Sequence, residues 1–228
     1  MSVWNSVRDA MNETMPYEDG TDEGDYDMNN DRLTVIHGAL MGIAWVFLAP
    51  AAIAVARYLK GVAHSNDDVS KMSLATWTWF RLHYILFGLV FILNMIAFGL
   101  IYKVTDSDHF DVNQNGAHVG IGLFIWIAIF VQMALGALIS YLYKPNRAST
   151  PWWDHIHHWF GRILFILCIV NIPLGINLYS QGLPEGMTVH PSLKAIYIVW
   201  VVAVAFGFGF MEIRRHNLKA RGLLNKDS

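Results

Sequence analysis

Five long apolar segments constrain the fold of this chain more than any other feature of its sequence. A hydrocarbon core about 30 Å thick is crossed by about 20 apolar residues in a helix, which satisfies its own backbone hydrogen bonds in lipid. Of the 228 residues, 54% are hydrophobic and only 15% are charged. We therefore predict an all-α fold, an integral membrane helical bundle with about five transmembrane helices at residues 34–58, 75–102, 117–143, 155–179 and 193–213.

The regions outside these spans differ in charge. The first 31 residues hold nine Asp or Glu and one basic residue, Arg8, which is unlike a signal peptide. We expect residues 1–32 to form an acidic, disordered, non-cytosolic tail, residues 33–215 the membrane domain, and residues 216–228 a basic cytosolic tail. The few basic residues form no stripe interleaved with aromatics, so no nucleic acid is expected as a partner.

The lysines and arginines predict the orientation in the membrane. Five crossings put the two termini on opposite sides. The side that carries the N-terminus receives four Lys or Arg, and the other side receives twelve. Because cytoplasmic loops collect basic residues, we predict a multi-pass protein with its N-terminus outside or luminal and its C-terminus cytosolic.

Four histidines inside the spans are the main functional signal, because an ionisable side chain within a membrane is costly. His37 and His118 open the first and third spans, while His83 and His157 lie near the starts of the second and fourth. Since successive spans run in opposite directions, the first pair lies near the outer surface and the second near the cytosolic surface. Each pair can supply the two axial ligands of a haem held between helices.

The chemistry of such sites follows from their ligands. An iron with histidine on both faces has no vacant position for oxygen, so outer-sphere electron transfer is the expected task. No Cys-x-x-Cys-His motif occurs, which predicts two noncovalent haem b groups. Zinc or copper is disfavoured because each pair offers two ligands. The lone Cys168 is expected to be a buried apolar residue.

The fourth span offers a choice of ligand. His155, His157 and His158 crowd its first turn, and His155 would lie nearest the aqueous boundary. His157 and His158 point about 100° apart, so one of them faces a given haem. Spacing alone does not decide between these two.

Four short motifs follow one another across consecutive spans. They are His37-Gly-Ala-Leu-Met41 with Ala56-Arg57, Trp79-Phe-Arg-Leu-His83, His118 followed by Gly122 and Gln132, and His157-His-Trp-Phe-Gly-Arg162 with Asn171-Ile-Pro-Leu-Gly175. Because of these motifs and their order, residues 33–215 resemble the eukaryotic cytochrome b561 family, particularly the b561 domain that follows DOMON domains in fungal and plant proteins. The resemblance implies His157, four residues before a glycine, as the fourth ligand. It also implies that His37 pairs with His118 and His83 with His157.

The resemblance further implies a transmembrane oxidoreductase. Family members carry electrons from a cytosolic donor, often ascorbate, to an outer acceptor such as monodehydroascorbate or ferric chelates. Arg57, Arg81 and Arg162 lie at the cytosolic mouth and are candidate contacts for an anionic donor or for haem propionates. Snorkelling at the interface is the competing interpretation. The lysine-rich ascorbate site of the animal proteins does not map onto this chain, so the donor stays open.

Two other functions stay in play. One is a quinone-linked cytochrome b subunit that anchors a larger dehydrogenase in the membrane. The other is a nonenzymatic haem-binding scaffold whose histidines stabilise packing. The expected partners are membrane lipid and a small-molecule donor and acceptor, and the sequence leaves open whether a homodimer or an extracellular redox partner also forms.

Overall fold

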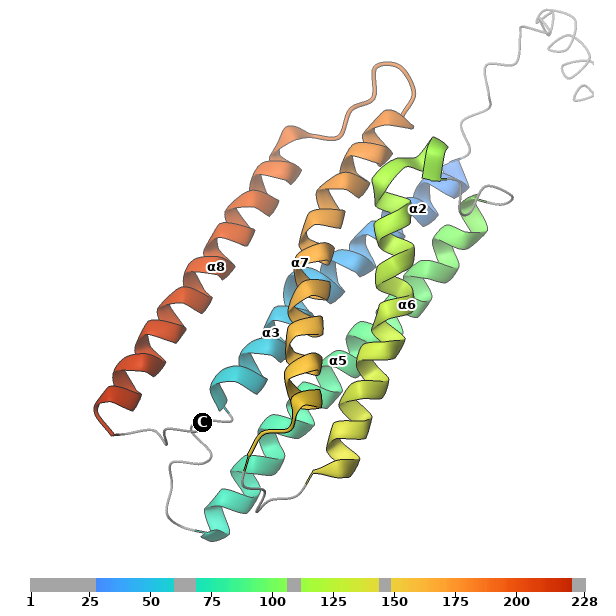
Figure 1. Ribbon diagram of the computed structural model, residues 1–228. Helices are drawn as coiled ribbons and strands as arrows, with labels where there is room; N and C mark the ends of the chain where they lie inside the picture. The colour runs from blue at the N-terminus through green and yellow to red at the C-terminus, as the bar shows by residue number, and fades with distance from the viewer. Residues whose placement is uncertain (1–27, 60–68, 106–111, 144–148, 223–228) are drawn as a thin grey trace, which may run out of the picture.

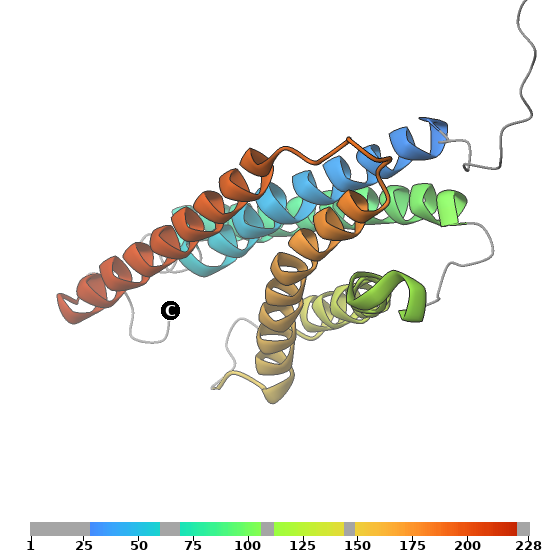
Figure 2. The same cartoon turned by 90° about the horizontal axis from the view of Figure 1, so that it is seen from above.

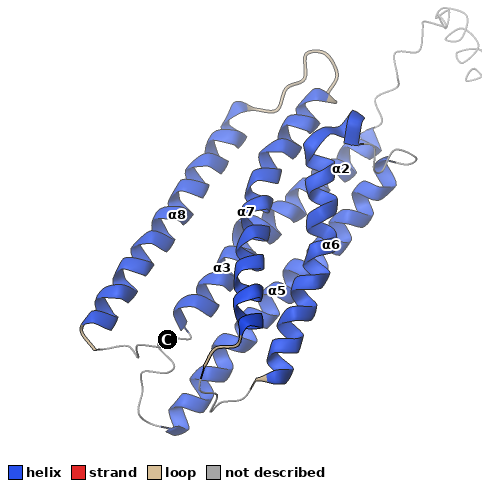
Figure 3. Cartoon of the chain, viewed as in Figure 1, coloured by secondary structure: helices blue, strands red, loops and turns tan. Residues whose placement is uncertain are grey.

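The computed structural model describes residues 28–59, 69–105, 112–143 and 149–222, which are mostly helical, with short loops and no strand among them (Figure 3). Most of the expected acidic tail and the end of the expected basic tail lie outside the described residues. The helices are α2 (Met28–Gly42), the π-helix η1 (Ile43–Leu48), α3 (Ala49–Ala54), the π-helix η2 (Val55–Leu59), α5 (Val69–Thr105), α6 (Val112–Leu142), α7 (Trp152–Gln181) and α8 (Pro191–Ala220).

The prediction of five spans is confirmed. By length and composition, five helices can cross a membrane, and they run a few residues beyond most predicted ends because helical hydrogen bonding continues into polar flanking residues. The third begins at Gly116, where φ is 65° and the backbone of α6 leaves helical geometry. These candidate spans are Met28–Leu59, Thr78–Thr105, Gly116–Leu142, Trp152–Gln181 and Pro191–Ala220.

The first span alternates between α-helical and π-helical turns. The segment η1 ends just before Pro50, which has no N–H to donate and so disturbs regular hydrogen bonding in the preceding turn. A π-helical turn accommodates one extra residue, so residues after η1 are displaced by one position relative to a plain α-helix.

The helices pack as two antiparallel hairpins. The first hairpin is the first span together with α5, and the second is α6 with α7. The hairpins meet where α7 contacts α2 and η1, and where α5 touches α6. Figure 1 shows α7 between α8 and α6, and Figure 2 shows the first span and α5 lying next to each other along one side of the second hairpin.

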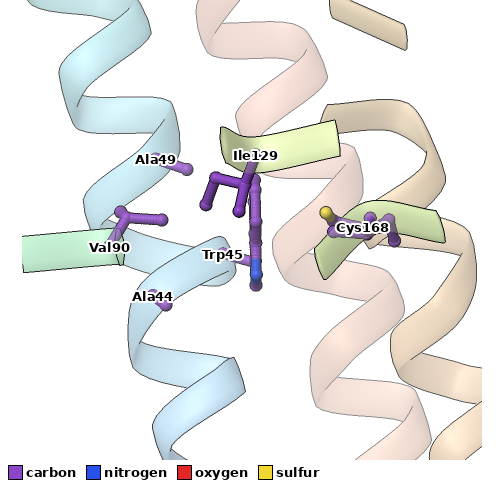
Figure 4. Close-up of a cluster of buried hydrophobic side chains, with 7 residues drawn as sticks. Ala44, Trp45, Ala49, Val90, Ile129 and Cys168 are labelled. Carbon is purple, nitrogen blue, oxygen red and sulfur yellow. The ribbon is translucent and has the colours of Figure 1, made fainter. Parts of the chain in front are cut away.

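The core lies midway along the bundle, between the levels of the histidines. Ala44 and Trp45 of η1 meet Val90 of α5, Ile129 of α6 and Cys168 of α7 there (Figure 4). Cys168 is 3% exposed and forms no disulfide, as expected for a buried apolar residue. One polar bond crosses this core, from Trp45 Nε1 to Asn94 Oδ1 at 3.1 Å.

Helix α8 is attached to the bundle by a few specific bonds. Pro173 inside α7 cannot donate to the carbonyl of Ile169, and Tyr197 Oη of α8 donates to that oxygen at 2.7 Å. At the other end of α8, Arg57 forms an ion pair with Glu212 at 2.7 Å. Helix α8 therefore packs without burying a residue of its own.

Candidate functional site

His37 and His118 come together from different hairpins. Their ring centroids lie 6.5 Å apart with an angle of 88° between the rings. Two metal–nitrogen bonds of about 2 Å each, with about 1 Å more from each nitrogen to its ring centre, would separate the centroids by about 6 Å. The spacing therefore fits two imidazoles that bind one metal from opposite sides.

The ring orientation of three histidines is set by backbone carbonyls. A carbonyl oxygen only accepts hydrogen bonds, so in each case Nδ1 carries the proton and Nε2 keeps its lone pair. Metal-binding histidines in proteins usually have such a second bond, which orients the ring. In each of these bonds the carbonyl belongs to the other helix of the same hairpin. The bonds run from His37 to Ala97 at 2.9 Å, from His83 to Ala52 at 3.0 Å and from His118 to Asn171 at 3.0 Å.

His157 lies at the opposite end of the bundle, near His83. The two rings lie within electrostatic range of each other. The His157 ring packs on α6, where a Cβ at Gly136 would lie 3.2 Å from its Cε1 atom. His157 is partly buried, whereas His155 and His158 are exposed. Of the three neighbouring histidines, His157 is therefore the one that faces the bundle.

Two glycines make room for these rings in the second hairpin. A Cβ at Gly175 would lie 2.7 Å from Cε1 of His118, closer than real side chains approach, so this position requires glycine. Gly136 makes room for His157 less strictly, because a Cβ there would lie 3.2 Å from Cε1 of that ring. Among the described residues, no atom beyond the local helix backbone lies within 4 Å of a Cβ at Gly38 or Gly42, so helix packing does not require glycine at these two positions near His37.

A spacing of fourteen residues recurs in these bonds. Three spans each contain a histidine and also a carbonyl that accepts from a histidine of the neighbouring helix. In α5 and α7 this carbonyl lies fourteen positions after the span's own histidine, and in the first span it lies fifteen positions after it. The extra residue is accounted for by the π-helical turn η1. The intervals run from His83 to Ala97, from His157 to Asn171 and from His37 to Ala52.

The candidate arginines lie near the His83 and His157 end. Arg57 makes two bonds to Glu212 Oε1 and one to Oε2, at 2.7–3.0 Å, so it is engaged with α8. The guanidinium of Arg162 lies 4.9 Å from the ring centre of Trp159. Arg81 is exposed, two residues before His83.

A site for a metal with several protein ligands is not found in the described part of the chain. There, no three His, Cys, Asp or Glu side chains come close enough to hold a metal ion. Paired imidazoles at two depths are instead suited to a planar macrocycle, which supplies four equatorial ligands itself and needs two axial ones. The residues present therefore fit haem at the His37 and His118 pair.

Comparison with known proteins agrees with this geometry. The family described as eukaryotic cytochrome b561 matches residues 36–181, more than half of the chain. A putative ferric-chelate reductase 1 homologue of Drosophila melanogaster is 30% identical over 185 residues, covering 81% of this chain and 26% of the relative. A cytochrome b561 and DOMON domain-containing protein of Arabidopsis thaliana is 27% identical, covering 64% of this chain and 32% of the relative. Human ferric-chelate reductase 1 is 28% identical, covering 75% and 26%.

The chain thus spans about a quarter to two fifths of the length of these relatives. No solved structure is significantly similar to it. The matched residues include all four span histidines and both helical hairpins. By this match the chain belongs to the eukaryotic cytochrome b561 family, whose members are haem-binding membrane oxidoreductases.

Proposed function

We propose that this chain carries single electrons across a membrane through two b-type haems. One haem is held by His37 and His118, and the other by His83 and His157. The donor is a cytosolic one-electron reductant such as ascorbate. The acceptor on the opposite side is monodehydroascorbate or a ferric chelate. The N-terminus lies outside and the C-terminus in the cytosol.

The observation that carries this proposal is the geometry of His37 and His118. Their rings face each other from two hairpins at 6.5 Å, and each Nδ1 is already bonded to a carbonyl. Both Nε2 atoms therefore keep a lone pair for iron without any change of tautomer. A haem bound there supplies one-electron redox chemistry at its iron.

The protein's own residues hold and separate the two sites. Ala52, which orients His83, lies fifteen residues beyond His37 along the first span, or about 20 Å at a helical rise of 1.5 Å. Between these levels the core around Trp45 and Val90 is apolar and close-packed, which keeps water out of the path. The chain therefore spaces two redox sites across most of the bilayer and insulates the gap between them.

The proposed acceptor is supported by the names of relatives, and the proposed donor by the charge at the His83 end. Two of the relatives are named ferric-chelate reductases, which favours a ferric chelate as acceptor. The chain spans only part of those proteins, so their full activity does not transfer directly. An anionic donor would be attracted by basic residues at the His83 end, where Arg81 and Arg162 lie.

The haem count tests the proposal directly. Pyridine haemochrome analysis of the purified protein should give two haems per chain. His37→Ala and His118→Ala should each remove one haem, and His83→Ala and His157→Ala the other. His158→Ala is the matched control and should retain both. A colourless wild-type protein prepared with ample haem would refute the proposal.

Direction and partners need a second experiment. In sealed vesicles with the C-terminus outside, ascorbate added to the medium should reduce both haems in a single turnover. A ferric chelate trapped inside the vesicles should reoxidise them. Reversing the orientation should abolish reduction by ascorbate while leaving reduction by a permeant reductant intact. Equal reduction by ascorbate in both orientations would contradict the proposed topology.

A further inference from the structure

Trp153 has a buried indole N–H for which the described residues offer no acceptor. It is the second residue of α7, and its Nε1 atom is buried without a hydrogen-bond partner among the described residues. An indole N–H is a donor only, and a buried tryptophan usually finds an acceptor for it. A buried donor left over in this way points to an acceptor that binds there and is not part of the chain.

Trp153 lies on the same side of α7 as His157. The two residues are four positions apart in one helix, so they are neighbours on its surface, about 5.4 Å apart along the axis. His157 faces the bundle, and Trp153 is partly buried. Because side chains in a helix lean toward its N-terminus, the indole lies between His157 and the membrane surface where α7 begins.

A tryptophan also stands four residues before the other ligand at this end. Trp79 precedes His83, and it is the second residue of the candidate span Thr78–Thr105. Both spans begin at the same surface, so the two tryptophans lie at the same level. The corresponding positions before the other two histidines hold different residues, Leu33 and Gln114. The tryptophans therefore distinguish one of the two haem sites from the other.

Lipid headgroups do not explain the buried N–H of Trp153. The neighbouring Trp152 is 68% exposed and can reach them, as tryptophans near a membrane surface commonly do. The Nε1 atom of Trp153 is instead inaccessible from outside the bundle. Its acceptor must therefore come from within the bundle, where His83 and His157 lie.

A haem propionate has the right chemistry for this acceptor. Haem b carries its propionate carboxylates on one edge, and a charged group inside a membrane is costly, so that edge favours the surface side of the ligands. Trp153 lies on that side of His157, in the first helical turn, whose partial positive charge attracts an anion. Asp154 in the same turn is buried and acts electrostatically on His157, so a second carboxylate there needs a donor of its own.

We propose that the indole N–H of Trp153 donates a hydrogen bond to a propionate of the haem held by His83 and His157. This bond fixes the rotation of the macrocycle about the axis through the two imidazoles, which the axial ligands alone leave free. It also offsets part of the negative charge near the iron. The inference rests on the proposed function, since it needs a haem at His83 and His157.

Trp153→Phe tests the role, because phenylalanine keeps an aromatic ring without the N–H. The haem at His83 and His157 should transfer to apomyoglobin about ten- to a hundred-fold faster, since a hydrogen bond to a charged group is lost. Its midpoint potential should fall, because less of the propionate charge is offset. The haem at His37 and His118 should keep its release rate and its potential, which shows that the variant is folded.

Haem with esterified propionates identifies the acceptor. Wild type and Trp153→Phe reconstituted with the dimethyl ester of haem b should release it from His83 and His157 at the same rate, because the ester has no charge for the N–H to stabilise. Faster release from the variant with the ester as well would overturn the proposal. A raised KM for ascorbate with unchanged release of ordinary haem would also overturn it and assign Trp153 to the electron donor.

Trp152→Phe is the matched control, since it removes the exposed N–H of the neighbouring residue. Trp126→Phe is a second control, because its Nε1 is also buried and unpaired among the described residues, but it stacks on Phe98 at 4.4 Å midway along α6. Neither should change the release of haem from His83 and His157. Release as fast in either control as in Trp153→Phe would overturn the specific bond.

The failure of this inference can be told apart from the failure of the proposed function. A wild-type chain without haem would refute the proposed function itself. Two haems in the wild type, with the same release rate and potential in Trp153→Phe, would overturn the bond to the propionate alone.

Discussion

Gly175→Ala should weaken haem binding at one end of the bundle only. The added Cβ would lie 2.7 Å from Cε1 and 3.1 Å from Nδ1 of His118, against 3.4–4 Å for ordinary contact. The ring must move by most of an ångström, and its 3.0 Å bond to the carbonyl of Asn171 stretches or breaks. The substitution leaves the helix backbone free to keep its geometry, so the effect falls on the ligand.

The magnitude follows from three opposing contributions. Overpacking costs about 1–3 kcal/mol, and loss of the bond to Asn171 costs about 1 kcal/mol more. Replacing glycine by alanine inside a helix returns about 1 kcal/mol. The net loss of about 1–3 kcal/mol corresponds to roughly 5- to 150-fold weaker haem binding at the His37 and His118 pair.

Haem transfer to apomyoglobin, followed by visible spectroscopy, measures this effect for each haem. Gly136→Ala should act more mildly and on the other haem, because its Cβ would lie 3.2 Å from the ring of His157. Gly207→Ala in α8 is the control, since no atom lies within 4 Å of its Cβ. The reasoning is refuted if Gly175→Ala releases haem no faster than Gly207→Ala.

Two further predictions concern the stability of the bundle. Trp45→Phe leaves Asn94 Oδ1, in a side chain 1% exposed, without its donor, so thermal unfolding in detergent should show a loss of about 1–3 kcal/mol; an unchanged midpoint would contradict the buried bond. Tyr197→Phe should cost about 1 kcal/mol because the carbonyl of Ile169 loses its donor. In a Pro173→Ala background the new backbone N–H can take that carbonyl, so the cost should vanish, and equal costs in both backgrounds would argue against this account.

The number of spans and their approximate limits could be predicted from the sequence. In lipid a chain must satisfy its own backbone hydrogen bonds, so apolar length and secondary structure are tightly coupled. The limits were less accurate. Helix α2 begins at Met28 rather than residue 34, since polar residues such as Asn30 continue the helix beyond the apolar stretch. The π-helical turns were not anticipated, and η1 depends on local hydrogen bonding around Pro50.

The depth of the histidines could be read from the sequence, but the residues that orient them could not. The carbonyls that accept from His37 and His118 lie 60 and 53 residues away, on other helices. Every residue has a backbone carbonyl, so the sequence does not indicate which carbonyl accepts the hydrogen bond. Gly136 was also missed. The sequence did contain one signal for it: Gln132 follows His118, and Asn171 follows His157, by fourteen positions, and a glycine follows four residues after each, Gly136 and Gly175.

The sequence by itself determined that the chain is a five-span helical bundle with four histidines at two depths. This follows because apolar length and helix direction are local properties in a membrane. The sequence already led us to expect that His37 pairs with His118 and that His157 is the fourth ligand. Only the tertiary structure shows the rings of His37 and His118 at 6.5 Å, and His157 packed on α6 while His158 is exposed. Those relations depend on how two hairpins pack and on glycines such as Gly175 that let them approach. Packing of this kind is set by contacts between residues far apart in the chain, and no local pattern encodes it.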